Sequence, residues 1–328
     1  MNNPDIEVTS PPPDGISCLR FSPITDYLAA SSWDGQIRIY EVQPNGTSIP
    51  KASYSHVGPA LSVAWSKDGT KVVSGGADKI GRMYDVATGQ STQIATHDDT
   101  IRSVCFLDGQ QTILATGSWD KTMKYWDLRS PQPIGTVNLP ERLYSMDTRQ
   151  NLLVAATADR HILLFDLNNP TTIFKQLLSP LKWQTRTVSC FIDGQGYAIG
   201  SIEGRCGIQY ISERDQMRNF SFKCHRDEAK NIYSVNEISF HPTYGTFSTC
   251  GSDGGVVFWD KDAKQKLKAL PNMNGPISTT SYNRNGNIFA YAISYDWTKG
   301  HKFYTPNSPN RILLHSVTDE ESKPRQKK

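Results

Sequence analysis

The chain has 328 residues, with 35 Lys and Arg against 32 Asp and Glu, so its formal net charge is only +3. This balance excludes a general electrostatic attraction to nucleic acid, and any basic binding surface must be local. No apolar run approaches the ~20 residues that span a bilayer, and the N-terminal residues do not form a signal peptide, so we expect a soluble intracellular protein that binds no membrane.

The six cysteines are scattered through the chain, without a Cys-x-x-Cys pair. Cys224 and His225 are adjacent, but no further ligand lies at metal-binding spacing. We therefore expect buried free thiols in a reducing compartment, and neither a metal site nor a cofactor.

The first predicted element is a strand over residues 5–9, which alternates in polarity and is cut off by Pro11-Pro12-Pro13. It precedes the repeats described next and belongs to none of their hairpins. It therefore needs a partner elsewhere in the chain.

A strand–turn–strand unit then recurs along the chain. In its clearest copy, residues 115–127, an apolar run breaks at Gly-Ser-Trp-Asp and resumes with a period-two alternation that ends in Trp-Asp. The turn acid recurs at intervals of 44, 42, 39, 44, 50 and 43 residues, by subtraction of the positions Asp34, Asp78, Asp120, Asp159, Glu203, Asp253 and Asp296. Intervals of about 40–45 residues are typical of propeller blades, whereas the hairpins of a β-sandwich have no such period. The sequence therefore predicts an all-β, seven-bladed WD40 β-propeller.

Two blades depart from the pattern. Blade five is followed by a long charged connection over residues 212–231, and blade seven carries an insertion over residues 297–310. Long insertions on a rigid ring are where function tends to collect.

Blade seven has predicted strands at 277–282, 288–293 and 311–317 but no fourth strand. We expect the N-terminal strand to complete this blade, which closes the ring and removes two sheet edges. The expected organisation is one monomeric propeller over residues 1–318, followed by a basic C-terminal tail over residues 319–328.

Three histidines precede the turn acid of their own blade, with a Ser or Thr between. A catalytic triad would occur once, with its own pocket, whereas these sets recur at the blade period. We assign them to structural networks that the strand aromatic joins, and predict no enzyme activity. The sets are His56-Ser74-Asp78, His97-Thr116-Asp120 and His225-Thr249-Asp253.

The turns that carry these acids are expected to open on one face of the ring. The residues beside the acids mix aromatic and basic side chains, the usual composition of an interface hot spot. The candidate aromatic anchors are Trp33, Trp119, Tyr295 and Trp297.

On the same face, Arg205 of blade five is expected beside residues 222–226 of the next connection. Arg205, Lys223 and Arg226 have few acids near them in the sequence, so they predict a pocket for carboxylates. The expected ligand is a partner segment with paired acidic residues.

Several motifs carry a resemblance to a known family. They are residues 5–12, 116–122, 139–142, 200–205, 222–226 and 258–262. With them the chain resembles, along nearly its whole length, the WD-repeat mRNA export factors of the nuclear pore. Residues 287–292 and 294–301 of blade seven separate it from the sibling Bub-type mitotic-checkpoint propeller.

The resemblance implies a partner, the GLEBS segment of an FG-repeat nucleoporin, and a location at the nuclear pore, in the nucleus, with shuttling to the cytoplasm. It implies that Trp33 and neighbouring aromatics of the face pack against the apolar side of that segment. Its paired glutamates would be held by Arg205, Lys223, His225 and Arg226.

The family also binds mRNA or other single-stranded RNA weakly, through a basic surface. Base stacking together with phosphate-binding lysines would be the mechanism. The candidates that match the family's sequence are Trp259, Lys261, Lys264, Lys299 and Lys302, with Asp262 and His301 beside them.

Three other functions remain open at this point. The first is a mitotic spindle-checkpoint adaptor that binds GLEBS-type segments of checkpoint kinases. The second is a propeller hydrolase, and the third is a primary RNA-binding protein without a protein partner.

Overall fold

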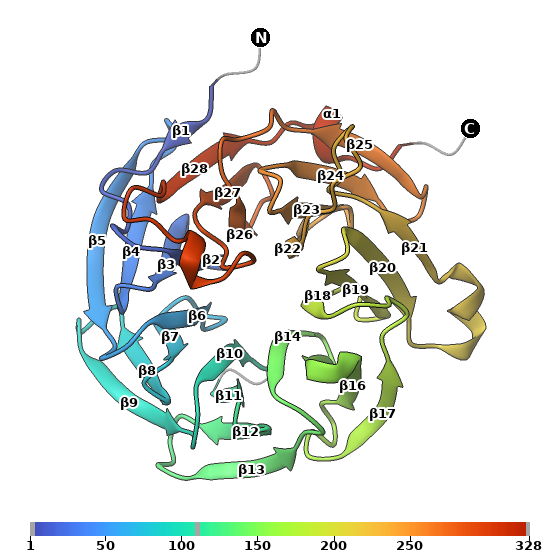
Figure 1. The fold of residues 1–328 in the computed structure, drawn as a ribbon. Helices are drawn as coiled ribbons and strands as arrows, with labels where there is room; N and C mark the ends of the chain where they lie inside the picture. Colours follow the sequence, from blue (N-terminus) through green and yellow to red (C-terminus); the bar gives the residue numbers. More distant parts are fainter. Residues whose placement is uncertain (1–3, 109–111, 326–328) are drawn as a thin grey trace.

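The computed structural model describes residues 4–108 and 112–325 of the chain. Within these ranges the chain forms seven four-stranded antiparallel sheets around a central channel (Figure 1). The prediction of a seven-bladed propeller is confirmed.

The first four blades follow the chain in order, from the innermost strand to the outermost. Blade one contains β2 (Ile16–Phe21), β3 (Tyr27–Ser32), β4 (Gln36–Val42) and β5 (Ser48–Ser55). Blade two contains β6 (Ala60–Trp65), β7 (Lys71–Gly76), β8 (Ile80–Asp85) and β9 (Ser91–Thr96). Blade three contains β10 (Ile101–Phe106), β11 (Ile113–Ser118), β12 (Thr122–Asp127) and β13 (Pro133–Asn138). Blade four contains β14 (Leu143–Arg149), β15 (Leu152–Thr157), β16 (His161–Asp166) and β17 (Ile173–Leu178).

The last three blades contain the irregular segments. Blade five contains β18 (Thr185–Cys190), β19 (Gly196–Ser201), β20 (Arg205–Tyr210) and β21 (Phe220–Lys223). Blade six contains β22 (Val235–Phe240), β23 (Phe247–Gly251), β24 (Val256–Asp260) and β25 (Gln265–Ala269). Blade seven contains β26 (Ile277–Tyr282), β27 (Ile288–Ile293), β28 (Arg311–Ser316) and the N-terminal β1 (Ile6–Glu7). Helical turns occur at η1 (Ala158–Arg160), η2 (Glu213–Arg218), η3 (His301–Phe303) and α1 (Asp319–Ser322).

The core lies between the blades. Second strands are buried along their length, and β15, with the sequence Leu-Leu-Val-Ala-Ala-Thr, is buried at every position. Outermost strands such as β17 alternate between half-buried and exposed residues, as a strand with one wet face does. In the described part of the chain, seven apolar clusters form, one at each interface between neighbouring blades. Each blade therefore depends on both neighbours for its core.

The N-terminal strand closes the ring, as predicted. In the ladder between β1 and β28, Ile6 lies opposite Leu314 and Glu7 lies opposite Leu313. Val8 follows the strand and is buried in the cluster between blades seven and one. The first and last strands of the chain are thus neighbours in one sheet.

Two segments differ from a simple reading of the sequence. Lys223, expected on a connection, lies at the end of β21, the fourth strand of blade five. The segment after residue 318 begins with α1, where Glu321 and Ser322 are buried, and the last three residues of the basic tail lie outside the described residues. No helix in the described ranges has the length and apolar character needed to cross a bilayer.

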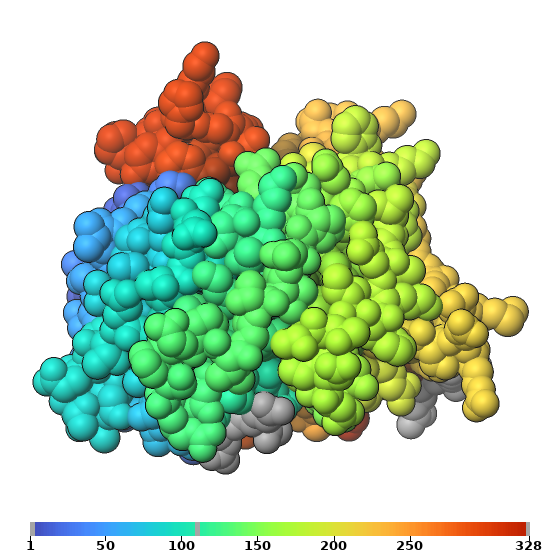
Figure 2. Space-filling view, turned by 90° about the horizontal axis from the view of Figure 1, so that it is seen from below, coloured from blue at the N-terminus to red at the C-terminus, as the bar shows by residue number. Residues whose placement is uncertain are grey.

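Antiparallel order assigns the loops to two faces of the disc. Second-to-third and fourth-to-first loops open on one face, called here the upper face, and the other loops open on the lower face. Figure 2 shows the disc from its side, with the orange-red blade-seven insertion projecting from the upper face and a hollow beside it.

Candidate functional interface

The turns of the upper face share one backbone geometry. In every blade the residue after the turn acid has a positive φ, between 59° for Gly204 and 81° for Gly35. These residues are Gly35, Lys79, Lys121, Arg160, Gly204, Gly254 and Trp297. The acid stabilises the turn by accepting a hydrogen bond from the backbone two residues on, as Asp34 does from Gln36 N at 2.9 Å and Asp120 from Thr122 N at 2.9 Å. The acid therefore stabilises the turn in five of the seven blades, and the residue beside it can carry function.

The three histidine sets form the predicted structural networks. In blade three, His97 Nδ1 lies 2.8 Å from Asp120 and Nε2 lies 2.7 Å from Thr116, whose hydroxyl also accepts the Trp126 indole N–H at 2.8 Å. The same pattern occurs around His56 and His225. Burial lowers the pKa of His97, although the charge and hydrogen bond of Asp120 oppose that effect. Each Ser or Thr hydroxyl is hydrogen-bonded within its network, so the three sets stabilise the blades.

His225 is not available to a partner. Its side chain has no exposed surface, and its two nitrogens contact Asp253 at 2.9 Å and Thr249 at 2.8 Å. The expectation that it holds a glutamate of a bound segment is therefore corrected: His225 supports the turn beneath the basic residues and does not reach the surface.

The four predicted aromatic anchors come together at the mouth of the central channel. Trp33 stacks on Trp297 with ring centroids 4.2 Å apart. Both indoles, together with Trp119 and Tyr295, line one cavity of about 550 Å³. We call these four residues the aromatic cluster.

The blade-seven insertion supports this cluster. Tyr304 stacks on Trp297 with ring centroids 5.2 Å apart, and its hydroxyl donates to Asp14 at 2.9 Å. Tyr295 donates to the Gly300 carbonyl oxygen at 2.7 Å. Trp297 itself has a φ of 62°, a strained conformation for a bulky residue, so surrounding contacts must hold it there. Tyr304 was not predicted, although a third aromatic in the insertion was a visible signal.

Arg205, Lys223 and Arg226, called here the basic edge, lie together at the blade-five rim of the upper face. Arg205 and Lys223 are directly opposite each other in the β20–β21 ladder, so their side chains share one side of the sheet. Arg226 follows within three residues and donates to the Glu203 carbonyl oxygen at 2.9 Å. None of the ion pairs between described residues includes any of the three.

Exposed apolar side chains flank the basic edge. Trp183 is 62% exposed, Ile232 51% and Ile202 38%. Backbone contacts place these side chains near one another. Ile202 N donates to the carbonyl oxygen of Gln184, the residue after Trp183, at 3.1 Å, and Ile232 forms a β-bridge with Arg226. Trp183 and Ile232 were missed in the sequence because they lie in fourth-to-first connections, which carry no repeat motif. Gln184 and Thr185 continue the surface into the lining of the 550 Å³ cavity.

The candidate RNA residues do not form one site. Lys299 and Lys302 are exposed on the upper face, in the second-to-third loop of blade seven. Lys261 and Lys264 follow β24 in a third-to-fourth loop and therefore lie at the lower face.

Part of the lower set is also unavailable. Lys261 is buried, pairs with Asp262 at 2.9 Å and lies over the Phe191 ring. Trp259 donates to Thr249 at 2.9 Å and packs on Phe222 with centroids 4.6 Å apart. The expectation of a stacking platform here is corrected, because these side chains hold blades five and six together.

The described residues contain no group of three or more potential ligands that could hold a metal ion. All six cysteines are free thiols, and five of them are buried. Burial raises the pKa of Cys224 to about 12, so the thiol next to the basic edge stays protonated at neutral pH.

Comparison with known proteins gives consistent relatives. The family model described as WD domain, G-beta repeat matches residues 7–41, 49–85, 89–127 and 217–260. The chain is 59% identical to the Poly(A)+ RNA export protein of Schizosaccharomyces pombe, covering 99% of this chain and 94% of that protein. It is 55% identical to the mRNA export factor GLE2 of Chaetomium thermophilum (98% and 92% covered) and 46% identical to the protein Rae1 of Drosophila melanogaster (96% and 95% covered).

Proposed function

The chain belongs to the family of WD-repeat mRNA export factors, which are non-enzymatic adaptors, and we propose that it docks through its upper face on the GLEBS segment of an FG-repeat nucleoporin. Membership of this family gives the chain a role in mRNA export between nucleus and cytoplasm. The location at the nuclear pore and the identity of the segment belong to the proposal.

The observation that carries the proposal is the basic edge. Three cations lie within one corner of the upper face, and no described carboxylate forms an ion pair with them. A segment with adjacent glutamates would supply the missing counter-charges through charge-assisted hydrogen bonds, with the forked guanidinium of Arg205 suited to bidentate contact.

The surroundings fit a segment that is apolar as well as acidic. Trp183, Ile202 and Ile232 flank the cations, and the aromatic cluster provides a concave apolar seat towards the channel. Large aromatic residues in a partly desolvated cavity are typical anchors of binding energy. The upper face thus offers an acid-binding corner and an apolar cavity on one continuous surface.

The direct test is titration of a synthetic GLEBS peptide against the double variant Arg205→Glu with Lys223→Glu. We expect a loss of about 2–5 kcal/mol in binding free energy, since like charges replace the paired ones. The matched control is Arg214→Glu with Lys266→Glu, which makes the same charge change at exposed positions near the lower face. Equal affinity of the two folded double variants would reject docking at the basic edge.

Weak RNA contact is proposed only for the upper face. Lys299 and Lys302 are exposed there, beside Phe303, which is 62% exposed and offers a ring for base stacking. The variant Lys299→Ala with Lys302→Ala should weaken binding of a single-stranded RNA and flatten its salt dependence. Lys264→Ala, at the lower face, should leave both unchanged.

A further inference from the structure

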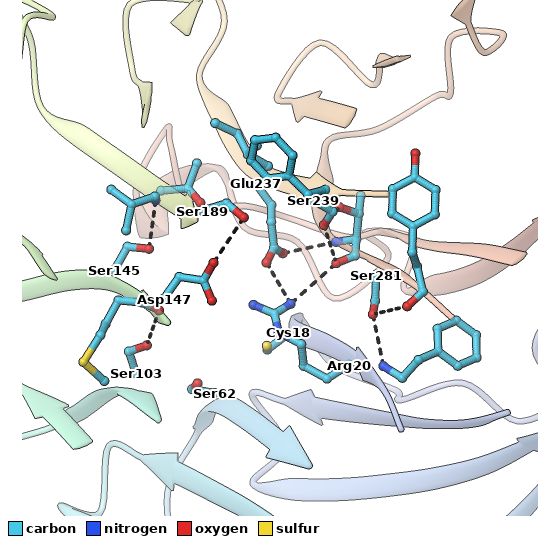
Figure 3. A pocket seen from close by; sticks show the side chains of 18 of the residues that line it. Cys18, Arg20, Ser62, Ser103, Ser145, Asp147, Ser189, Glu237, Ser239 and Ser281 are labelled. Carbon is cyan, nitrogen blue, oxygen red and sulfur yellow. Dashed lines mark hydrogen bonds and ion pairs between the residues drawn. The ribbon is translucent and has the colours of Figure 1, made fainter. Parts of the chain in front are cut away.

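Two cavities follow one another along the central channel. The lower one, of about 320 Å³, is drawn in Figure 3, and the upper one is the 550 Å³ cavity beneath the aromatic cluster. The residues that line both cavities lie where the two meet, and this part of the channel is called here the waist. They are Ser17, Arg102, Tyr144, Arg186, Asn236 and Ser278.

Two guanidinium groups line this waist, and neither forms an ion pair with a described carboxylate. Arg186 donates to the Asp296 backbone carbonyl at 2.6 Å, and Arg102 makes one long contact of 3.5 Å with the Leu61 carbonyl. Neither takes part in an ion pair between described residues. Burial lowers the pKa of both groups, and the charge of Arg186 lowers that of Arg102 further, whereas the charges of Asp296 on Arg186 and of Glu237 on Arg102 oppose this shift. Each side chain has only the one hydrogen bond to the described chain, so its other N–H groups face the channel.

The carboxylates of the channel are already engaged. Glu237 pairs with Arg20 at 2.8 Å, as Figure 3 shows, and Asp147 accepts the Cys190 N–H at 2.7 Å. Asp296 accepts from Asn236 at 2.8 Å and from Thr298 at 2.7 Å. None of these three carboxylates can therefore turn to pair with a guanidinium of the waist without breaking the contacts that it already makes.

Polar atoms around the upper cavity are also left without partners. The indole N–H groups of Trp119 and Trp297 and the Thr185 hydroxyl are buried and form no hydrogen bond within the described chain. Asn236 Oδ1, at the waist, is unpaired as well. Buried polar groups in native proteins are almost always paired, so these atoms indicate that a polar ligand with both accepting and donating atoms can be bound here.

We propose that the waist of the channel is a binding site for a phosphate group, held by Arg102 and Arg186. A tetrahedral oxyanion can accept two hydrogen bonds from each planar guanidinium, and Tyr144 belongs to the same lining. The upper cavity leaves room for a group attached to the phosphate, next to aromatic rings that suit a nucleobase. The phosphate subsite is separate from the basic edge, whereas the upper cavity is the one that the proposed peptide would also use, so the test is made on the chain without peptide.

The test measures binding of inorganic phosphate and of adenosine monophosphate to the full chain, by calorimetry and by thermal shift, in chloride buffer at matched ionic strength. We expect both ligands to raise the melting temperature of the wild type. Tighter binding of the nucleotide would place its base in the upper cavity, and equal binding would restrict the site to the phosphate.

Arg102→Gln should weaken binding of both ligands about tenfold or more, because it removes one guanidinium fork. Without phosphate its melting temperature should not fall, since a repelling charge is removed. Arg102→Lys keeps the charge without the fork and should fall between wild type and Arg102→Gln, and it serves if the glutamine variant does not fold. Arg214→Gln, exposed in η2, is the control and should bind as wild type does. The proposal is overturned if neither ligand binds, or if the Arg102 variants bind as tightly as the control.

Discussion

The closure of the ring should depend on pH through His315. This side chain, in β28, contacts Asp5 next to β1 at 2.7 Å through Nδ1 and Glu321 of α1 at 3.2 Å through Nε2. It therefore links the last strand of the chain to both terminal segments. Burial alone would lower the pKa of His315, but the hydrogen bonds and charges of Asp5 and Glu321 outweigh it and raise the pKa.

The sign of the effect follows from that shift. A raised pKa in the folded state means that the charged form is stabilised by folding, fully so below the unfolded value of 6.5. This stability is lost as the pH rises through the folded pKa. The contact is a charge-assisted hydrogen bond between buried groups, worth about 1.5–3 kcal/mol.

The perturbation is His315→Gln, which keeps a polar side chain but cannot carry a proton. Urea unfolding at pH 6 and at pH 9 should show the wild type more stable than the variant by about 1.5–3 kcal/mol at pH 6, with most of that difference gone at pH 9. The comparison with the variant is needed because burial lowers the pKa of His56 and His97. Their contribution to the stability of the fold is lost as the pH falls, whereas that of His315 is lost as the pH rises. A difference that stays constant between the two pH values would refute the reasoning.

Three further predictions concern the turns of the upper face and the histidine networks. Gly254→Ala should destabilise the protein by about 2 kcal/mol more than Gly300→Ala, as measured by chemical denaturation. Both glycines have a positive φ, but only at Gly254 would a Cβ lie against a backbone oxygen, that of Met273 at 2.2 Å. Lys79→Gly should stabilise the protein by about 0.5–1 kcal/mol, since an exposed lysine at a φ of 67° is replaced by a residue that adopts this conformation freely, and an unchanged calorimetric melting temperature would contradict this. His97→Gln should cost about 2–4 kcal/mol by leaving two buried partners unpaired, yet leave peptide affinity unchanged once the variant is assayed below its melting temperature.

The fold was predictable because one local requirement recurs. Every turn has a residue with a positive φ after the acid, and in five of the seven the acid accepts the backbone N–H two residues on, so the spacing of the acids reports the blades directly. The aromatic cluster followed from the same logic, since Trp33, Trp119 and Tyr295 precede turn acids that all open on one face.

The predictions from the sequence were wrong or missing for side chains whose positions depend on the packed structure. Nothing near Lys261 in the sequence shows that its ammonium group lies over Phe191 of the preceding blade. The position of His225 between Lys223 and Arg226 predicts a surface cation, but its hydrogen bonds to Thr249 and Asp253 hold the side chain in the interior. Trp183 belongs to a connection without a motif, and only the packed structure shows it exposed beside the basic edge.

The join between β1 and β28 has a consequence for synthesis on the ribosome. Ile6 is synthesised long before its partner Leu314, so the nascent chain carries an unpaired sheet edge at each end of an open arc of blades. Six blades can stack as they appear, but the seventh is complete only when β28 pairs with a segment made before all the blades. A chaperone that shields this segment would therefore act throughout the synthesis of the propeller, and a ribosome stalled before β28 would release an incomplete, aggregation-prone arc.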